Sequence, residues 1–465
     1  MIAARQLADA ALALQKIVKK KNKEPADWNA VMRLAASLGD SDTALAAARA
    51  SLAQAPNDPH RQAALIDALG AVAKHEEAAR LARELQKNPA AAADGYYLEG
   101  AFQARLGNRT EALTLLRRAL SLNDGHITAW EQIALLNGYD DLGADLAAMG
   151  ALAKQLTAPN ELIPLLYALG RAYDYAGDTD HAFQCIANGA ALRQRLSPFN
   201  LHPLIAYLER LRTTFTPALI DQLRSEGSDD NIIFILTAPR SGSTLIEQIL
   251  ATAPSVTPTG EHTLLRLATL QLGSMEPPDM SRALNYKNSD WRKMAQSYLS
   301  AVRRRFGSSA AYTDKTMINY YYAGVIKIMF PAVKLVWCKR DPRDVAWSCF
   351  RSRISANQWA QNLDDCANFL LAHNQLCEHW ADIYGDNLIQ VSYEDLVTNP
   401  DKSTSELFGQ LKIEQPENWQ DFYKDGGAVA TASLAQVRQP LNNKAVGSWR
   451  RYDKHLAPIY DKYFH

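Results

Sequence analysis

The sequence predicts a multidomain fold in which an all-α helical solenoid precedes an α/β domain with a central parallel sheet. Two observations support this prediction. The first part of the chain is rich in Ala and Leu at helical spacing and repeats with a fixed period, whereas the second part alternates short apolar runs with amphipathic ones. We expect a repeat domain over 1–205, a connecting helix and linker over 206–230, and the α/β domain over 231–465.

The composition argues against several classes of protein. The 50 Lys and Arg residues balance 50 Asp and Glu residues, which argues against a dedicated nucleic-acid binder. The five cysteines form no CxxC pair, so we expect reduced thiols, a cytoplasmic protein and no metal site. The sequence has no run of ~18 apolar residues, so we expect no membrane span.

The repeat domain is indicated by a period of 34 residues. Small residues at such a period let paired helices pack closely, and stacked pairs bury a continuous core, as in the tetratricopeptide repeat that this pattern resembles. We count about five repeats over 11–195, and the one that starts near Ala129 is degenerate because Leu146 replaces an alanine. An unrelated helical bundle is the alternative. Two series keep the period: Ala44, Ala78 and Ala112, and Gly39, Ala73 and Gly107.

The α/β domain begins with a strand, a tight turn and a helix. An apolar run predicts a buried strand over 232–236, and an amphipathic run predicts a helix over 243–252. Such a turn directs backbone N–H groups to the helix N-terminus, where an anion is favoured. A nucleoside triphosphatase loop would have a lysine where this chain has Ser243, so ATP or GTP hydrolysis is disfavoured. We expect an oxyanion cradle made of Pro239, Arg240, Ser241, Gly242, Ser243 and Thr244.

A second anion site is expected at the end of the next long strand. Arg340 follows this strand, and Ser348 lies about two turns into the helix after it, so both side chains can reach one further phosphate. An ion pair of Arg340 with Asp341 or Asp344 is the alternative interpretation. The other expected elements are a connecting helix over 207–223, helices up to about 307, near 318–329, over 343–353 and over 359–384, and strands over 333–338 and 387–393.

Two anion sites on neighbouring strand ends, one without the triphosphatase lysine, resemble those of the sulfotransferases over about residues 231–455. Within that family the chain looks most like the tyrosylprotein sulfotransferases and the bacterial sulfotransferases fused to tetratricopeptide repeats. The resemblance implies a P-loop-like domain with 3′-phosphoadenosine-5′-phosphosulfate (PAPS) as donor, 3′,5′-adenosine diphosphate as product, and no metal. The cradle would hold the 5′-phosphosulfate, and Arg340 with Ser348 would hold the 3′-phosphate.

The resemblance also implies roles for single residues. Glu261, in a Gly-Glu pair, would be the general base, and Lys315, in an Asp-Lys pair, would be the catalytic lysine. Ser433, in a Ser-x-x-Gln-Val stretch, would lie at the transferring group, and Tyr393 would lie near the adenine. The resemblance therefore implies four catalytic residues: Glu261, Lys315, Ser433 and Arg240 of the cradle.

The chain departs from the tyrosyl members of that family at two positions. Ser352 stands where those proteins have an arginine, which Arg351 or Arg353 could replace. Ser448, in the stretch Gly447-Ser448-Trp449-Arg450 that resembles the closing tail, stands where they have a lysine. Three basic residues could replace that lysine: Arg438, Lys444 and Arg450. We assign Arg438 and Lys444 to the donor site.

The implied chemistry is an in-line sulfuryl transfer, in which positioning and charge stabilisation dominate. Glu261 would take the proton of the acceptor hydroxyl, while Arg240 and Lys315, with Ser433, would stabilise the leaving nucleotide. The repeats favour a polypeptide acceptor, with tyrosine as a candidate, or a partner protein; a homodimer is a further alternative. A carbohydrate or small-molecule acceptor, a non-catalytic scaffold that binds nucleotide, and a kinase-like enzyme remain as competing hypotheses.

Overall fold

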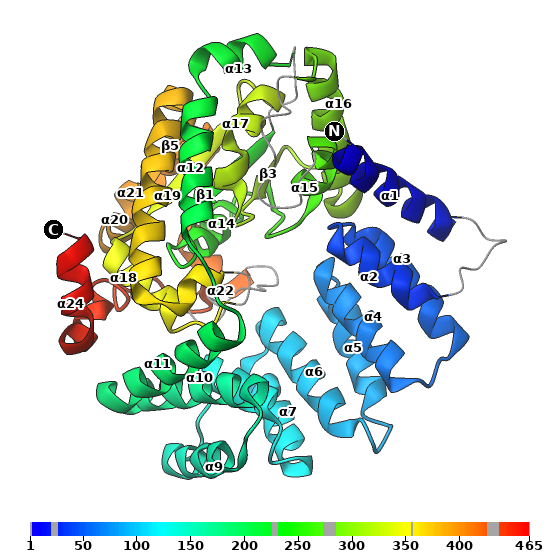
Figure 1. Ribbon diagram of the computed structural model, residues 1–465, viewed down its shortest axis with the longest axis vertical. Helices are drawn as coiled ribbons and strands as arrows, with labels where there is room; N and C mark the ends of the chain where they lie inside the picture. Colours follow the sequence, from blue (N-terminus) through cyan, green and yellow to red (C-terminus); the bar gives the residue numbers. More distant parts are fainter. Residues whose placement is uncertain are drawn as a thin grey trace.

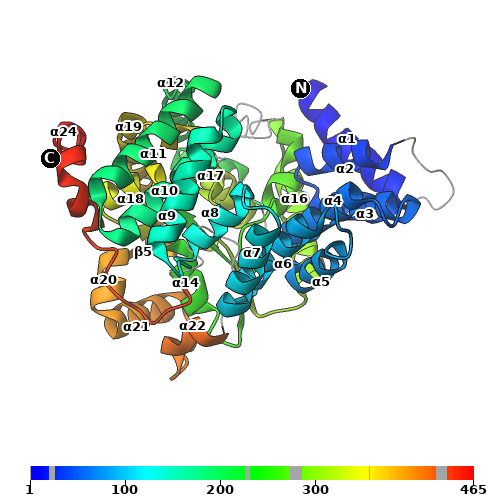
Figure 2. The ribbon, with the colours of Figure 1, turned by 90° about the horizontal axis from the view of Figure 1, so that it is seen from below.

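The structure is a computed structural model that describes residues 2–19, 27–225, 231–272, 285–354, 357–425 and 437–464. A curved array of helices comes first along the chain, and an α/β domain follows it (Figure 1). The array arches beside the domain, and the same arrangement is seen from below in Figure 2. Within the described residues, no helix is both long enough and apolar enough to cross a membrane.

The array consists of helix pairs, which confirms the predicted repeat architecture. The second helices of the first three pairs begin at Ser41, His75 and Arg109, and are therefore spaced by the predicted period. The helices are α1 (Ile2–Lys19), α2 (Trp28–Ser37), α3 (Ser41–Gln54), α4 (Pro59–Ala71), α5 (His75–Leu85), α6 (Ala92–Leu106), α7 (Arg109–Leu122), α8 (Ile127–Leu135), α9 (Leu142–Gln155), α10 (Pro159–Ala176) and α11 (Thr179–Leu196).

The small residues of the period lie where the two helices of a pair cross. Ala78 and Ala112 are fully buried. At Gly100 on α6, an added Cβ would lie 3.1 Å from the carbonyl oxygen of Ala112 and 3.1 Å from Cγ of Leu116 on α7. A larger side chain at this position would force the two helices apart, because protein interiors leave little room for an extra atom. The pair α8 and α9, predicted as degenerate, is irregular in that α10 packs against both of its helices.

Two helices, rather than the single expected one, connect the array to the α/β domain. They are α12 (His202–Thr214) and α13 (Pro217–Leu223). The chain breaks between them because Pro217 cannot continue a helix but is well suited to start one. The hydroxyl of Thr216 accepts a hydrogen bond from the backbone N–H of Leu219 at 3.2 Å and caps the new helix.

The described part of the α/β domain contains a five-stranded parallel sheet with the order β2-β3-β1-β4-β5. Two of these strands, β2 and β3, were not predicted from the sequence. They have only three and four residues, which is too short for an apolar pattern to emerge. The strands are β1 (Ile232–Thr237), β2 (Val256–Pro258), β3 (Ala311–Asp314), β4 (Lys334–Lys339) and β5 (Leu388–Ser392).

Helices cover both faces of the sheet. The helix predicted over 343–353 ends at Phe350, and the one predicted over 359–384 is divided at Asn362, whose side chain caps a new helix. The helices are α14 (Ser243–Leu250), α15 (Leu264–Ala268), α16 (Asn288–Phe306), α17 (Asn319–Met329), α18 (Pro342–Phe350), α19 (Leu363–Tyr384), α20 (Tyr393–Thr398), α21 (Pro400–Leu411), α22 (Phe422–Asp425) and α24 (Asp453–Tyr463), with short 3-10 helices η1 (Leu270–Leu272), η3 (Gln358–Gln361), η4 (Gly385–Asn387), η5 (Trp419–Asp421) and η6 (Ser448–Tyr452).

The core of the α/β domain continues into the helical array. Alternate residues of β1 point to opposite faces of the sheet. Ile232, Phe234 and Leu236 join one apolar cluster, and Ile233 and Ile235 join a second one. Both clusters also include buried side chains of the later repeats, whereas a further cluster, formed by α3 to α6, contains repeat residues alone.

Both ends of the array are bound to the α/β domain. At the first end, Arg266 Nη2 donates to the carbonyl oxygen of Ser37 at 2.6 Å, and α1 contacts η1. At the other end, the hydroxyl of Tyr452 donates to Asp174 Oδ1 of α10 at 2.6 Å. In Figure 1 the array therefore follows a curve along one side of the α/β domain, with both of its ends in contact with that domain.

Candidate active site

The turn between β1 and α14 has the conformation that an anion cradle requires. Gly242, at the N-cap of α14, has a φ of 107°, and Arg240 has a φ of 70°, which is rare for a residue with a side chain. A Cβ on Gly242 would lie 2.6 Å from Cδ2 of Tyr393, so the tyrosine ring closes directly over the turn. Because Gly242 has no side chain to cap α14, an external anion could satisfy the first N–H groups of the helix.

Two buried thiols donate hydrogen bonds to backbone carbonyl groups of the turn. The Sγ of Cys338 on β4 donates to the carbonyl oxygen of Ser241 at 2.8 Å, and the Sγ of Cys349 on α18 donates to that of Pro239 at 3.3 Å. Burial raises the pKa of both thiols, that of Cys349 to about 12, so they remain neutral donors. The cysteines expected to be reduced and buried thus support the cradle, and they do not act as nucleophiles there.

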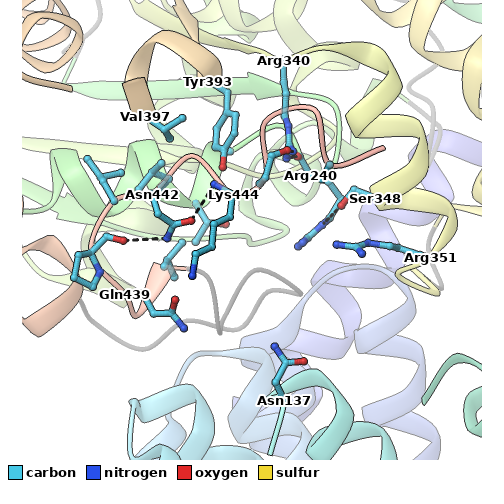
Figure 3. A pocket seen from close by; sticks show the side chains of 18 of the residues that line it. Asn137, Arg240, Arg340, Ser348, Arg351, Tyr393, Val397, Gln439, Asn442 and Lys444 are labelled. Carbon is cyan, nitrogen blue, oxygen red and sulfur yellow. Dashed lines mark hydrogen bonds between the residues drawn. The ribbon is translucent and has the colours of Figure 1, made fainter. Parts of the chain in front are cut away.

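A cavity of about 290 Å³ opens beside the turn, at the carboxyl ends of β1, β4 and β5 (Figure 3). Figure 3 shows Arg240, Ser348 and Arg351 near one another, with Tyr393 and Lys444 across from them. The residues that line it include Arg240, Gly242, Thr244, Arg340, Ser348, Arg351, Tyr393, Lys444 and Ser448 of the α/β domain, and Asn137 and Asp174 of the repeats. The structure therefore brings Arg240, Gly242 and Thr244 of the predicted cradle together with Arg340 and Ser348 in one cavity. The other three cradle residues are not among those that line it: Pro239, Ser241 and Ser243.

Direct contacts join the two predicted anion sites. Arg240 Nε donates to the hydroxyl of Ser348 at 3.0 Å, and Arg340 Nη1 donates to the carbonyl oxygen of Arg240 at 2.9 Å. The guanidinium of Arg340 also lies 4.4 Å from the ring centroid of Tyr393, a cation–π contact. The Nε of Arg340 is buried and makes no hydrogen bond with the described residues.

The alternative interpretation of Arg340 is an ion pair with Asp341 or Asp344. Asp341 pairs with Arg343 at 2.9 Å, and Asp344 gives Arg340 only a long contact. Arg340 Nη2 lies 3.8 Å from Asp344 Oδ2. Asp344 instead accepts hydrogen bonds from the backbone N–H groups of Gly447 at 2.7 Å and Trp449 at 3.1 Å, and from the hydroxyl of Ser448 at 2.9 Å. This buried carboxylate thus anchors the C-terminal tail over the cavity, and Ser448 is one of its donors.

The cavity has an excess of positive charge. Burial and the positive charges of Arg171, Arg351 and Arg340 lower the pKa of Arg240 to about 9, so this side chain stays charged at neutral pH. Burial and the charge of Arg351 likewise lower the pKa of Arg171, on α10, to about 10. Several guanidinium groups that repel one another at a cavity are typical of a site for a multiply charged anion.

The structure distinguishes between the two arginines that could replace the one missing at Ser352. Arg351 lines the cavity, and its Nη1 lies 3.0 Å from Asp174 Oδ2. Arg353 does not line it; its guanidinium forms two hydrogen bonds with Glu131 of α8, at 2.7 and 2.9 Å. Arg351 is therefore the cavity residue of the two.

Glu261 and Lys315 form a second group, at the ends of the neighbouring strands β2 and β3. Lys315 Nζ lies 3.1 Å from Glu261 Oε1 and 3.8 Å from Glu247 Oε2. The Lys315 side chain is 3% exposed, whereas that of Glu261 is 37% exposed and can meet a molecule from solvent. Neither residue is among those that line the cavity. The strand register, in which Pro258 pairs with Thr313, brings the two chain segments together.

The remaining predicted residues are found in different places. Lys444 lines the cavity and is exposed. Arg438 lies toward the repeats, where its Nη2 donates to the carbonyl oxygen of Arg105 at 3.2 Å, and the guanidinium of Arg450 packs 5.1 Å from the ring centroid of Trp449. Ser433 lies outside the described residues.

The residues at this site that sequence reasoning missed include Glu247 and Asp174. Asp174 belongs to the repeats, so nothing in its local sequence points to a cavity in the other half of the chain. Glu247 had a detectable signal: it is a charged residue within the run Leu245 to Leu250, which is otherwise apolar except for Gln248. A carboxylate on the buried stripe of a helix usually has a partner.

Comparisons with known proteins support a sulfotransferase domain in this region. Residues 232–417 match the sulfotransferase family. An "Uncharacterized protein" of Aquifex aeolicus (strain VF5) is 28% identical over 305 residues, which are 63% of this chain and 40% of that protein. The present chain thus spans about two fifths of that relative's length.

A protein of Caenorhabditis briggsae named "Putative protein-tyrosine sulfotransferase" is 23% identical over 230 residues, which are 47% of this chain and 81% of that protein. Among solved structures, the sulfotransferase domain from the Synechococcus PCC 7002 olefin synthase is 21% identical. That similarity covers 49% of this chain and 90% of that domain, with a TM-score of 0.36.

Proposed function

We propose that this chain is a PAPS-dependent sulfotransferase that acts on a hydroxyl group. The observation that supports this best is the convergence of Arg240, Arg340 and Arg351 with Ser348 at a turn that lacks the triphosphatase lysine. A nucleotide that bears phosphate groups at both its 3′ and 5′ positions matches two neighbouring anion sites better than a linear triphosphate does. The match of residues 232–417 to the sulfotransferase family supports the same reaction class.

In this proposal the cradle residues 239–244 bind the 5′-phosphosulfate, and Arg340, Ser348 and Arg351 bind the 3′-phosphate. The buried Nε of Arg340, which has no hydrogen-bond partner among the described residues, is a donor that a phosphate oxygen would satisfy. Burial, and after it the repulsion among the guanidinium groups, lowers the pKa of Arg240, and a bound dianion would oppose both effects. Tyr393, which already stacks on Arg340, offers its ring to the adenine.

In the transfer step, we propose roles for the second group of residues, Glu261 and Lys315. Glu261 takes the proton of the acceptor hydroxyl, which its exposure allows. Lys315 and Arg240 stabilise the negative charge that grows on the leaving nucleotide, and Ser433 is proposed to assist them. We expect Glu261→Gln to reduce turnover by at least ~100-fold and to leave nucleotide binding unchanged, since it removes a general base without changing the side-chain volume.

We propose a polypeptide as the acceptor, with tyrosine as the candidate residue. The helical repeats and the similarity to the Caenorhabditis briggsae protein support this choice. A carbohydrate or small-molecule hydroxyl is the second candidate, because the side chains that line the cavity include the amides of Asn137, Gln439 and Asn442, which could bind a small polar acceptor. A radiolabelled-sulfate transfer assay with tyrosine peptides, serine peptides and simple glycosides decides between them.

Calorimetric titration of the full chain tests the donor class. We expect 3′,5′-adenosine diphosphate to bind at least tenfold more tightly than ATP, because only the former offers a phosphate to each anion site. The variant Lys339→Ala is a suitable control, since Lys339 is exposed, does not line the cavity, and directly precedes Arg340. Equal or tighter binding of ATP would contradict the proposal.

A further inference from the structure

Glu247 is a buried carboxylate that connects the separate parts of the candidate active site. Its residue surface is 2% exposed, on a helix whose residues from Thr244 to Leu250 are all buried. Its Oε1 accepts hydrogen bonds from the backbone N–H of Gly260 at 2.9 Å and from the hydroxyl of Thr313 at 2.8 Å. Its Oε2 lies 3.8 Å from Lys315 Nζ. A carboxylate is costly to bury, so three partners at one buried carboxylate indicate a built arrangement.

The partners of Glu247 belong to the segments that carry the proposed catalytic groups. Gly260 directly precedes Glu261, and its φ of 69° makes the sharp bend after β2. Thr313 lies two residues before Lys315 on β3. Glu247 itself lies on α14, whose N-terminus forms the anion cradle. One side chain therefore fixes the cradle helix, the base segment and the lysine segment relative to one another.

Glu247 also contributes to the electrostatic environment of Lys315. Burial alone would lower the pKa of Lys315, but the negative charges of Glu247 and Glu261, with a smaller contribution from Asp314, outweigh burial and raise it. His262 also neighbours Lys315; it is buried, and burial lowers its pKa, so it is neutral at pH 7. Tyr298, which donates to Asp314 at 2.7 Å, stays a neutral phenol because burial raises its pKa. Burial raises the pKa of Glu247 itself, and the positive charge of Lys315 opposes that rise, so the two groups favour each other's charged form. Glu247 thus helps to keep the buried Lys315 a cation.

We infer that Glu247 is a positioning residue that orients Glu261 and Lys315 toward the cradle and keeps Lys315 positively charged during sulfuryl transfer. This inference rests on the proposed function. It assigns no new chemical step to Glu247, which touches neither donor nor acceptor. A purely structural role would predict loss of stability alone, whereas this role also predicts a change in how activity depends on pH.

The decisive variant is Glu247→Gln, measured in the full chain by sulfate transfer and by titration with 3′,5′-adenosine diphosphate. The glutamine keeps an oxygen for Gly260 and Thr313 but removes the negative charge. We expect kcat to fall about 10- to 100-fold, as for a small displacement of reacting groups. The affinity for the nucleotide should change less than about twofold, because the cradle itself is intact.

The pH profile provides the readout that separates the two roles. Lys315 is active while protonated, so activity is present below its pKa and is lost as the pH rises through it. Removing one carboxylate lowers that pKa, and the alkaline limb of kcat should therefore move to lower pH in Glu247→Gln. The matched control is Glu99→Gln, which neutralises a glutamate of the repeats that is 1% exposed and pairs with Arg83. Its alkaline limb should stay where the wild type has it.

Each outcome has a defined meaning. An unchanged kcat and an unchanged alkaline limb in a folded Glu247→Gln variant overturn the inference but leave the proposed function standing. A wild-type chain that binds no 3′,5′-adenosine diphosphate and transfers no sulfate overturns the proposed function, and this inference with it. If Glu247→Gln does not fold, Thr313→Val decides: it removes one donor to Glu247, and a turnover equal to wild type would contradict the inference.

Discussion

At the scale of the residue, the side chains of the site contact and orient one another in the absence of a ligand. Arg340 supports the backbone of Arg240 through its Nη1 and stacks on Tyr393 through its flat face. It keeps its Nε without a protein partner among the described residues. An arginine with one unassigned donor can bind an anion without first breaking a bond that the fold needs.

Arg340→Ala should weaken the binding of 3′,5′-adenosine diphosphate by roughly 1.5–3 kcal/mol, the scale of a charge-assisted hydrogen bond. The loss should shrink for 5′-AMP, which has no 3′-phosphate. Calorimetry with both nucleotides measures this difference, and Lys339→Ala serves again as the neighbouring control. Equal losses for the two ligands would show that Arg340 does not bind the 3′-phosphate.

At the scale of the element, the unit that matters is the turn with the helix that follows it. The thiols of Cys338 and Cys349 bind its carbonyl groups from one side, and the ring of Tyr393 closes over Gly242 from the other. The turn is therefore clamped between β4, α18 and α20. Its conformation is set before any ligand arrives, which lowers the cost of binding.

Gly242→Ala should disturb the conformation of the turn through two effects, one on the backbone and one on the packing of Tyr393. The φ of 107° is unfavourable for alanine, at a cost of order 1–3 kcal/mol, and the new Cβ would press on the Tyr393 ring at 2.6 Å. We expect a lower Tm and weaker nucleotide binding. Gly409→Ala is the control, because Gly409 lies within α21 with open space around it, so alanine should leave binding unchanged and raise stability slightly. A variant Gly242→Ala with normal binding would contradict the clamp.

The elements that carry the site show how far sequence patterns reach. The cradle, Arg340 and Ser348 could be located because strand ends and helix starts have local signals, and the cavity unites them. The strands β2 and β3 could not, since three or four residues give no period. The partner of Arg351 could not either, because Asp174 is 177 residues away along the chain and only tertiary packing brings them together.

At the scale of the whole molecule, the repeats and the α/β domain share their buried surface and one cavity. Asp174 of α10 contacts Arg351 at 3.0 Å, Arg451 at 3.1 Å and the hydroxyl of Tyr452 at 2.6 Å. The sequence-based boundary near residue 205 therefore divides a continuous core, and residues of the repeats help to line the cavity.

Asp174→Asn should destabilise the full chain by about 1–3 kcal/mol, because it leaves partly buried cationic and hydroxyl partners without their carboxylate. Urea unfolding measures the change. Asp180→Asn is the matched control: Asp180 also joins the repeats to the C-terminal helix, through Lys454 and His455, but on the exposed surface, where a pair contributes little. Similar effects of the two substitutions would contradict the central role given to Asp174.

The attachment of the array at both ends changes the order in which its helices should unfold locally. An open solenoid frays from its termini, because each outermost repeat has a neighbour on one side only. Here the α/β domain takes the place of a terminal cap on both sides, at Ser37 and at Asp174. The least supported repeat is the one between, where α4 and α5 bury their apolar side chains in a cluster that contains repeat residues alone. Hydrogen exchange of the full chain should therefore be faster in α4 and α5 than in α10, and local unfolding should begin in this middle part of the array.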